Sequence, residues 1–110
     1  YEGRRMGVAL DSIVSPGCIV SGGRVVRCVL SPHVRVNSWC DVQESILLDS
    51  AQIGRYSRIR RAIIDTGAAV PEGSVIGFNP DEDRAKGYHV TDSGIVVVPV
   101  DQESYSLAAV

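Results

Sequence analysis

A repeat of seventeen residues dominates the sequence between positions 13 and 77. When the chain is written in lines of seventeen, three columns hold only aliphatic side chains. The columns are Ile13, Leu30, Leu47 and Ile64; Ile19, Val36, Ile53 and Val70; and Val25, Val42, Ile59 and Ile76. A fixed period of this kind indicates a solenoid, in which each repeat buries its apolar side chains by stacking on its neighbours.

Small residues recur four positions after the first and the second column. They are Gly17, Val34, Ala51 and Ala68, and then Gly23, Cys40, Ser57 and Ser74. This pattern predicts three short strands per coil, joined by tight corners around a narrow interior. An amphipathic helix would need apolar residues at spacings of about 3, 4 and 7, which the repeat does not supply steadily. We therefore predict an all-β fold, a single-stranded parallel β-helix of about four coils, which rise by about 4.8 Å each.

Composition narrows the classes of function. The 110 residues suit one domain, and 11 basic against 13 acidic side chains give a net charge of −2, which favours no nucleic-acid partner. No apolar run approaches the roughly 20 residues of a membrane span, so we expect no membrane contact and a cytoplasmic location. Three cysteines without a Cys-x-x-Cys pair and two histidines predict no metal or other cofactor in this chain.

The two ends of the chain break the period. Residues 81–86 begin with three acids and end with a base, which predicts a short helix closed by Gly87. Residues 95–99 predict a final apolar strand. We therefore divide the chain into a linker from another part of a larger protein at 1–10, β-helix coils at 11–79, and a C-terminal cap and tail at 80–110.

Charged and aromatic residues between the columns also follow the period. Opposite charges one coil apart stabilise each other by about 0.2–1 kcal/mol per pair. Arg35 and Arg60 have no acidic residue one coil above or below them, so they are candidates for an anionic ligand. The outward files are Arg24, Asp41 and Arg58; Arg27, Glu44 and Arg61; and the pair Trp39 and Tyr56.

Four segments of the sequence resemble one protein family, both in their residues and in the order in which they occur. They are residues 11–22 (DSIVSPGCIVSG), 29–38 (VLSPHVRVNS), 70–84 (VPEGSVIGFNPDEDR) and 94–98 (GIVVV). Together they resemble the C-terminal domain of bacterial glucose-1-phosphate adenylyltransferase, also called ADP-glucose pyrophosphorylase. The resemblance covers roughly residues 7–99.

The resemblance implies a left-handed β-helix of the hexapeptide-repeat type, although crossovers between parallel strands are usually right-handed. It also implies a larger parent nucleotidyltransferase, which binds ATP and converts it with glucose 1-phosphate into ADP-glucose, for glycogen biosynthesis, and pyrophosphate. Mg²⁺ would lie in the missing catalytic domain. The implied role of this chain, which would hold no catalytic residue, is to pack against that domain of the same polypeptide, to help build a homotetramer and to contribute to an allosteric site.

The effectors that the resemblance implies are anionic metabolites such as AMP, phosphate and sugar phosphates. Guanidinium groups match the oxygens of such ligands in geometry and charge. We predict that Arg60 contributes to the effector site, with Arg58 and Arg61 near it as weaker candidates and Arg35 as a further one.

Two other functions stay open at this point. An independent hexapeptide-repeat acyltransferase would use a coil histidine such as His33 as a base in a cleft between trimer subunits, and it would bind acyl-CoA. A purely structural oligomerisation module would bind no ligand. The seventeen-residue coils, the short length and the linker-like start argue against the acyltransferase.

Overall fold

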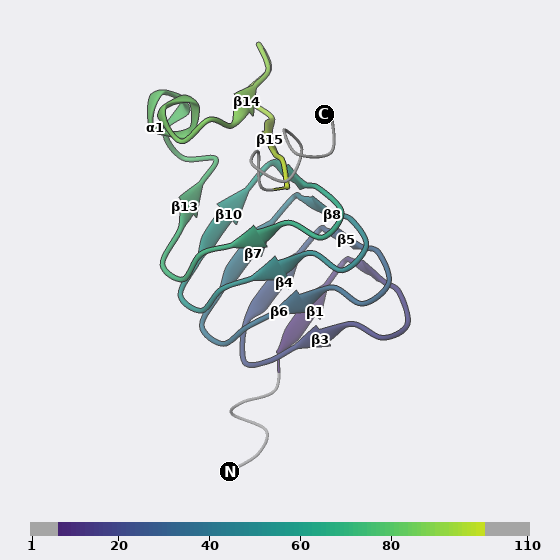
Figure 1. Cartoon of the computed structure of the whole chain (residues 1–110). Helices are drawn as coiled ribbons and strands as arrows, with labels where there is room; N and C mark the ends of the chain where they lie inside the picture. The colour runs from purple at the N-terminus through teal and green to yellow at the C-terminus, as the bar shows by residue number, and fades with distance from the viewer. Residues whose placement is uncertain (1–6, 101–110) are drawn as a thin grey trace, which may run out of the picture.

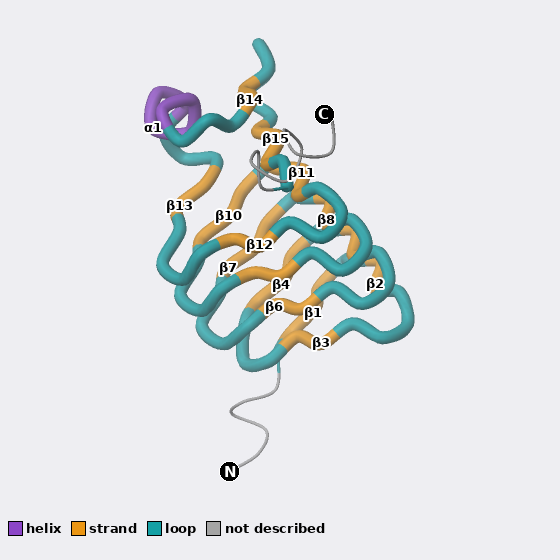
Figure 2. Tube along the Cα trace, in the orientation of Figure 1, coloured by secondary structure: helices purple, strands orange, loops and turns teal. Residues whose placement is uncertain are grey.

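The computed structural model describes residues 7–100 as a stack of coils with a cap at one end (Figure 1). Figure 2 shows that strands of neighbouring coils lie in line with one another and that turns separate them within each coil. The elements are β1 (Val8–Leu10), β2 (Ile13–Val14), β3 (Ile19–Val20), β4 (Arg24–Val26), β5 (Val29–Leu30), β6 (Arg35–Val36), β7 (Asp41–Gln43), β8 (Ile46–Leu47), β9 (Gln52–Ile53), β10 (Arg58–Arg60), β11 (Ala62–Ile64), β12 (Ala69–Val70), β13 (Val75–Ile76), α1 (Pro80–Ala85), β14 (His89–Val90) and β15 (Val96–Val98).

Each coil contributes one strand to each of three sheets. The five-stranded sheet has the order β1-β4-β7-β10-β13, the six-stranded sheet β14-β15-β11-β8-β5-β2 and the four-stranded sheet β12-β9-β6-β3. The strand pairs between coils are parallel, whereas β14 runs antiparallel to β15. This arrangement confirms the predicted parallel β-helix of about four coils.

Every corner between strands contains a residue with a positive φ. The three files of such residues are Asp11, Arg27, Glu44 and Arg61; Gly17, His33, Ser50 and Gly67; and Gly22, Trp39, Tyr56 and Gly73. A residue other than glycine in this conformation costs roughly 1–2 kcal/mol. Packing in the core offsets this conformational cost, because the corners let each coil place its aliphatic side chains over those of the coil below.

The predicted columns are correct from the second coil onward. Their ten buried members are Val25, Leu30, Val36, Val42, Leu47, Ile53, Ile59, Ile64, Val70 and Ile76. The two first-coil positions were predicted wrongly: Ile13 is 68% exposed and Ile19 is 48% exposed. Val14 pairs with Leu30 and Val20 pairs with Val36, so these valines occupy the columns instead.

The error in the first coil comes from one corner. Residues 21–22 join Val20 to Gly23, whereas three residues, 37–39, join Val36 to Cys40 one coil later. The first coil is therefore sixteen residues long, and a shift of one residue along a strand exchanges the inside and the outside of a sheet. By the same shift Cys18, and not Gly17, packs against the core.

The β-helix also begins earlier than the predicted boundary at residue 11. Strand β1 pairs in parallel with β4 over three residues, so residues 8–10 form part of the first coil and not of a linker. The remainder of the predicted linker, residues 1–6, and the tail, residues 101–110, lie outside the described residues.

The predicted helix and final strand are both present. The side chain of Asn79 caps α1 by accepting hydrogen bonds from the amides of Asp81 and Glu82. Strand β15 pairs with β11 and buries Val96 and Val98, so it extends one sheet by a further rung as well as covering the last coil. At six residues α1, the helix within residues 7–100, is too short to cross a membrane.

Gly77 connects the last coil to the cap. It has a φ of +89°, and a Cβ at this position would collide with the carbonyl oxygen of Arg60. Its amide donates a hydrogen bond of 3.1 Å to Oδ2 of Asp83, whose side chain is buried. Asp83 therefore holds α1 against the end of β13. Burial raises the pKa of nearby Tyr88, and the Asp83 carboxylate adds a smaller effect in the same direction.

The substitution Ile59→Asp tests the register of the coils. Ile59 is 1% exposed in the middle of a column, so an aspartate there buries a charge without a partner. We expect a loss of more than about 3 kcal/mol in the free energy of unfolding, measured by urea titration. Gln52→Ala, an exposed position, should change it by less than about 0.5 kcal/mol. Unfolding of Ile59→Asp at the wild-type midpoint would contradict the register.

A pair of glycine substitutions tests the junction with the cap. Gly67 and Gly77 both have a positive φ, but a Cβ at Gly67 meets no atom within 4 Å. We expect Gly67→Ala to cost about 1–2 kcal/mol, because only the backbone conformation is unfavourable. Gly77→Ala should cost about 2–4 kcal/mol, because the collision with Arg60 adds to it. Equal melting temperatures for the two variants would contradict the close approach.

Candidate functional site

Arg58 and Arg60 lie side by side on the outer face of the five-stranded sheet. They are two residues apart on β10 and both side chains are exposed. The guanidinium carbon of each lies 4.7 Å from the centroid of the Phe78 ring, so one aromatic ring orders both cations. Nη2 of Arg60 also donates a hydrogen bond of 3.3 Å to the carbonyl oxygen of Gly77. Two positive charges are thereby held next to each other at the edge of the cap.

The charge ladder predicted on this face is in register. In the strand register, Asp41 lies next to Arg24 in the coil before it and next to Arg58 in the coil after it. Within residues 7–100, however, the direct ion pairs are His33–Asp49 and Arg84–Asp81, and neither belongs to the ladder. Asp41 instead accepts hydrogen bonds of 3.2 and 3.3 Å from Nε2 of Gln43. The guanidinium groups of the ladder therefore keep hydrogen-bond donors for an external partner.

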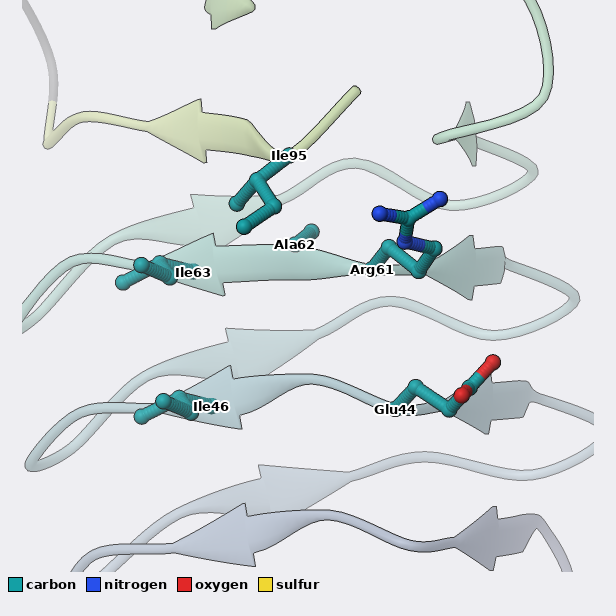
Figure 3. A pocket seen from close by; sticks show the side chains of 6 residues that line it. All are labelled: Glu44, Ile46, Arg61, Ala62, Ile63 and Ile95. Atoms are coloured by element: carbon teal, nitrogen blue, oxygen red, sulfur yellow. The ribbon is translucent and has the colours of Figure 1, made fainter. Parts of the chain in front are cut away.

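Arg61 lies apart from the pair of Arg58 and Arg60. It occupies a corner, and its Nη2 donates a hydrogen bond of 2.9 Å to the carbonyl oxygen of Ser93. Its neighbour one coil below is Glu44, and Figure 3 shows Arg61 above Glu44 and Ile63 above Ile46. These side chains border a shallow hollow of about 260 Å³, lined by Glu44, Ile46, Arg61, Ala62, Ile63 and Ile95. Arg61 therefore belongs to a different surface from Arg60.

Arg35 lies on a third surface, that of the four-stranded sheet. It is exposed on β6, and its Nε donates a hydrogen bond of 3.1 Å to Oδ1 of Asn37. Its cross-strand neighbours are Ile19 and Gln52. Of the four predicted site residues, the structure thus brings together Arg58 and Arg60 and separates Arg35 and Arg61 from them.

An aliphatic stripe runs along the outer face of the six-stranded sheet, which sequence reasoning missed. Its members face outward on successive strands: Ile13, Val29, Ile46, Ile63 and Val97. Ile13, Val29 and Ile46 are 68%, 39% and 41% exposed. Parallel sheets are usually covered on both faces, so this exposed stripe is a candidate contact surface. The sequence signal that could have revealed the stripe is a second aliphatic residue directly before the inward-facing residue of each of these strands.

His33, the base of the acyltransferase alternative, lies at an exposed corner. Its Nδ1 is 3.6 Å from Oδ1 of Asp49, and the two side chains are 70% and 51% exposed. A catalytic base needs a site that excludes water and positions a substrate. The open surroundings of His33 in this chain do not favour that role.

Two buried cysteine thiols have shifted pKa values. Burial raises the pKa of the Cys28 and Cys40 thiols, which keeps both protonated near neutral pH. In residues 7–100 no three His, Cys, Asp or Glu side chains converge to hold a metal ion. Among residues 7–100, the arginine pair, the stripe and its hollow are candidate functional surfaces.

Comparisons with known proteins place the chain in a family. The model of the family described as "GlmU-like, C-terminal hexapeptide" matches residues 1–98. The chain is similar to glucose-1-phosphate adenylyltransferase of Koribacter versatilis, with 60% identity over 106 residues, which cover 96% of this chain and 24% of the relative. The proteins of the same name from Rhodopirellula baltica and Anaeromyxobacter are 54% and 52% identical, over 88% and 86% of this chain and 22% and 23% of the relatives.

These matches confirm the resemblance that the four segments predicted. The chain spans about a quarter of the length of the curated relatives it matches, and it corresponds to their C-terminal part. The coil of about seventeen residues, the three parallel sheets and the match over residues 1–98 agree with one another. The chain belongs to the GlmU-like C-terminal hexapeptide family.

Proposed function

We propose that this chain is the non-catalytic C-terminal β-helix part of a cytoplasmic glucose-1-phosphate adenylyltransferase. The observation that carries the proposal is the identity of 50–60% to enzymes of that name over most of the chain. The parent enzyme would convert ATP and glucose 1-phosphate into ADP-glucose and pyrophosphate. ATP, its Mg²⁺ and the reacting atoms would be held by the part of the parent outside this chain, since the described residues offer no converging set of metal ligands.

The first role of the β-helix is to bind an anionic effector at the arginine pair. Arg58 and Arg60 present two guanidinium groups on one exposed face, and Phe78 orders both. Phosphate groups take several charge-assisted hydrogen bonds from such groups. Ordering before binding reduces the entropy that the ligand must overcome. AMP, phosphate and sugar phosphates all carry the group that this pair would recognise.

The second role is to hold the catalytic part of the same polypeptide against the aliphatic stripe. The stripe presents aliphatic side chains on five strands, and the hollow beside Ile46, Ile63 and Ile95 would receive an apolar side chain of the catalytic part. Glu44 and Arg61 at its border offer charged partners to the rim of such a contact. The third role is assembly of the parent into a homo-oligomer, with the homotetramer as the expected form.

The effector role is tested on the full-length enzyme with Arg60→Ala. Loss of a hydrogen bond from a charged group should raise the effector concentration for half-maximal activation or inhibition about tenfold or more. Activity without effector should stay unchanged. Arg55→Ala, another exposed arginine of this chain, serves as the control for net charge. An unchanged half-effect concentration in Arg60→Ala removes Arg60 from the effector site.

The role of the stripe is tested with Ile46→Asp in the full-length enzyme. Ile46 is 41% exposed, so the β-helix itself should tolerate the change. A charge in the contact should instead separate the unfolding of the β-helix from that of the catalytic part, which calorimetry would record as two transitions in place of one. Gln52→Asp on the four-stranded sheet is the matched control. A single transition at the wild-type temperature in Ile46→Asp would contradict this contact.

A further inference from the structure

We propose that the outer face of β4, β7, β10 and β13 is a self-complementary interface at which two copies of this chain associate. The proposal deepens the assembly role proposed above and rests on it. It concerns a surface other than the aliphatic stripe, because the stripe lies on the six-stranded sheet. The evidence lies in how charge, hydrogen-bonding groups and aromatic rings are arranged along the files of this face.

Three parallel files define the face. Asp41 and Arg58 are neighbours in the first file, and Gln43 and Arg60 are neighbours in the second. The third file is the corner that precedes these strands. It holds Trp39 in the coil of β7 and Tyr56 in the coil of β10, with Gly22 and Gly73 in the coils on either side. In each file, the residue on β7 or in its coil can therefore pair with the residue on β10 or in its coil: Asp41 with Arg58, Gln43 with Arg60, and Trp39 with Tyr56.

A two-fold axis makes these differences match. Consider an axis parallel to the strands, midway between β7 and β10 and in the plane of the contact. Rotation about it places each file opposite itself and reverses the order of the coils. Asp41 then faces Arg58 of the second copy, Gln43 faces Arg60, and Trp39 faces Tyr56. Because the contact is isologous, each of these pairs occurs twice.

Other axes on the same face give poor pairs. An axis that passes through β7 sets Asp41 against Asp41 of the second copy and Arg24 against Arg58. An axis along the direction of coil stacking exchanges the first two files and sets Arg58 against Arg60. Like charges opposite each other at an interface are strongly unfavourable. An axis midway between β4 and β7 also pairs opposite charges, Arg24 with Asp41, but it sets Val26 against Gln43 and Gly22 against Trp39. The charge file together with the other two files therefore selects the axis between β7 and β10.

The groups that this axis pairs keep free bonding capacity in one copy. Asp41 makes no direct ion pair and accepts hydrogen bonds only from the amide of Gln43 among residues 7–100. That bond uses Nε2 of Gln43 as the donor and leaves its carbonyl oxygen to accept from Arg60 of the second copy. Phe78 holds both arginines in place before the copies meet. The polar contacts of the dimer are thus ordered in advance.

The aromatic corner supports the same conclusion. Trp39 and Tyr56 are 62% and 56% exposed, and both have a positive φ. Glycine occupies the equivalent corners in the neighbouring coils, so bulky rings here are unfavourable for the isolated chain in both conformation and exposure. Stacking of Trp39 on Tyr56 of the second copy covers both rings. Tryptophan, tyrosine and arginine are also the residues that most often dominate binding energy at protein interfaces.

Charge reversal tests the interface by sedimentation velocity of the 110-residue chain. We expect the wild type to be dimeric. Asp41→Arg places arginine opposite Arg58, and Arg58→Asp places aspartate opposite Asp41. Each single variant should therefore raise the dissociation constant at least about a hundredfold. An equimolar mixture of the two should recover the dimer. In the mixed dimer the two introduced charges face each other with opposite sign, and the native Arg58 of one copy still faces the native Asp41 of the other. Recovery on mixing can come only from contacts between copies.

Controls separate this interface from the other surfaces. Gln52→Arg changes charge on the four-stranded sheet and should leave the dimer intact, while circular dichroism checks that each variant is folded. The proposal is overturned by a monomeric wild type, by single variants that remain dimeric, or by a mixture that stays monomeric. It is also overturned if Ile46→Asp dissociates the dimer, since the stripe would then be the interface. If the chain is dimeric but Arg60→Ala leaves the effector response unchanged, the effector role is refuted and the proposed interface is not.

Discussion

The structure depends on the hydrogen bonds that each coil makes to the next. Backbone amides of one coil donate to carbonyl oxygens of the following coil at all three sheets, as in Asp41 to Ser57 at 2.9 Å and Arg58 to Ser74 at 2.8 Å. This ladder fixes which residue lies over which. Equivalent positions of successive coils are therefore stacked on one another. Inside, they form columns of Val, Leu and Ile, and outside they form files of charged residues. The same constraint that builds the core therefore also builds each outer surface.

The three sheets give the molecule three outer faces with different chemistry. The face of β10 carries ordered arginines and the complementary ladder, the six-stranded sheet carries an aliphatic stripe, and the four-stranded sheet carries Arg35 and Gln52. Because side chains alternate between inside and outside along each strand, changes on a face leave the core intact. A β-helix can thus assign domain contact to one surface and charge recognition to another, and in this chain we propose that anion binding and self-association share the face of Arg58 and Arg60.

Much of the fold could be predicted because its signal is periodic. Ile59 and nine other column members were placed correctly from spacing alone, since every coil after the first has the same length. Ile13 and Ile19 were misplaced because a corner of two residues cannot be told from a corner of three without the hydrogen bonds across it. The extra strand β14 was also beyond prediction, since its pairing with β15 depends on the path of the cap.

The candidate site was only partly predictable. Periodicity identified Arg60 as lacking an acidic neighbour, but the contact of Phe78 with both Arg58 and Arg60 comes from a segment where the period has ended. Arg61 was grouped with Arg60 because it is adjacent in sequence, yet Arg61 lies at the corner that follows β10, which turns its side chain onto another surface. The stripe was overlooked because Val29 and Ile46 lie directly before buried residues and look like part of the same apolar run.

Amide hydrogen exchange of the folded chain tests the stacked coils most directly. In this structure the amides of Gln52 and Arg58 bond the next coil at 2.9 and 2.8 Å although their side chains are exposed. They should therefore exchange as slowly as the amides of the buried neighbours Ile53 and Ile59. Fast exchange at Gln52 and Arg58, with protection confined to residues whose side chains are buried, would contradict the inter-coil ladder and the fold built on it.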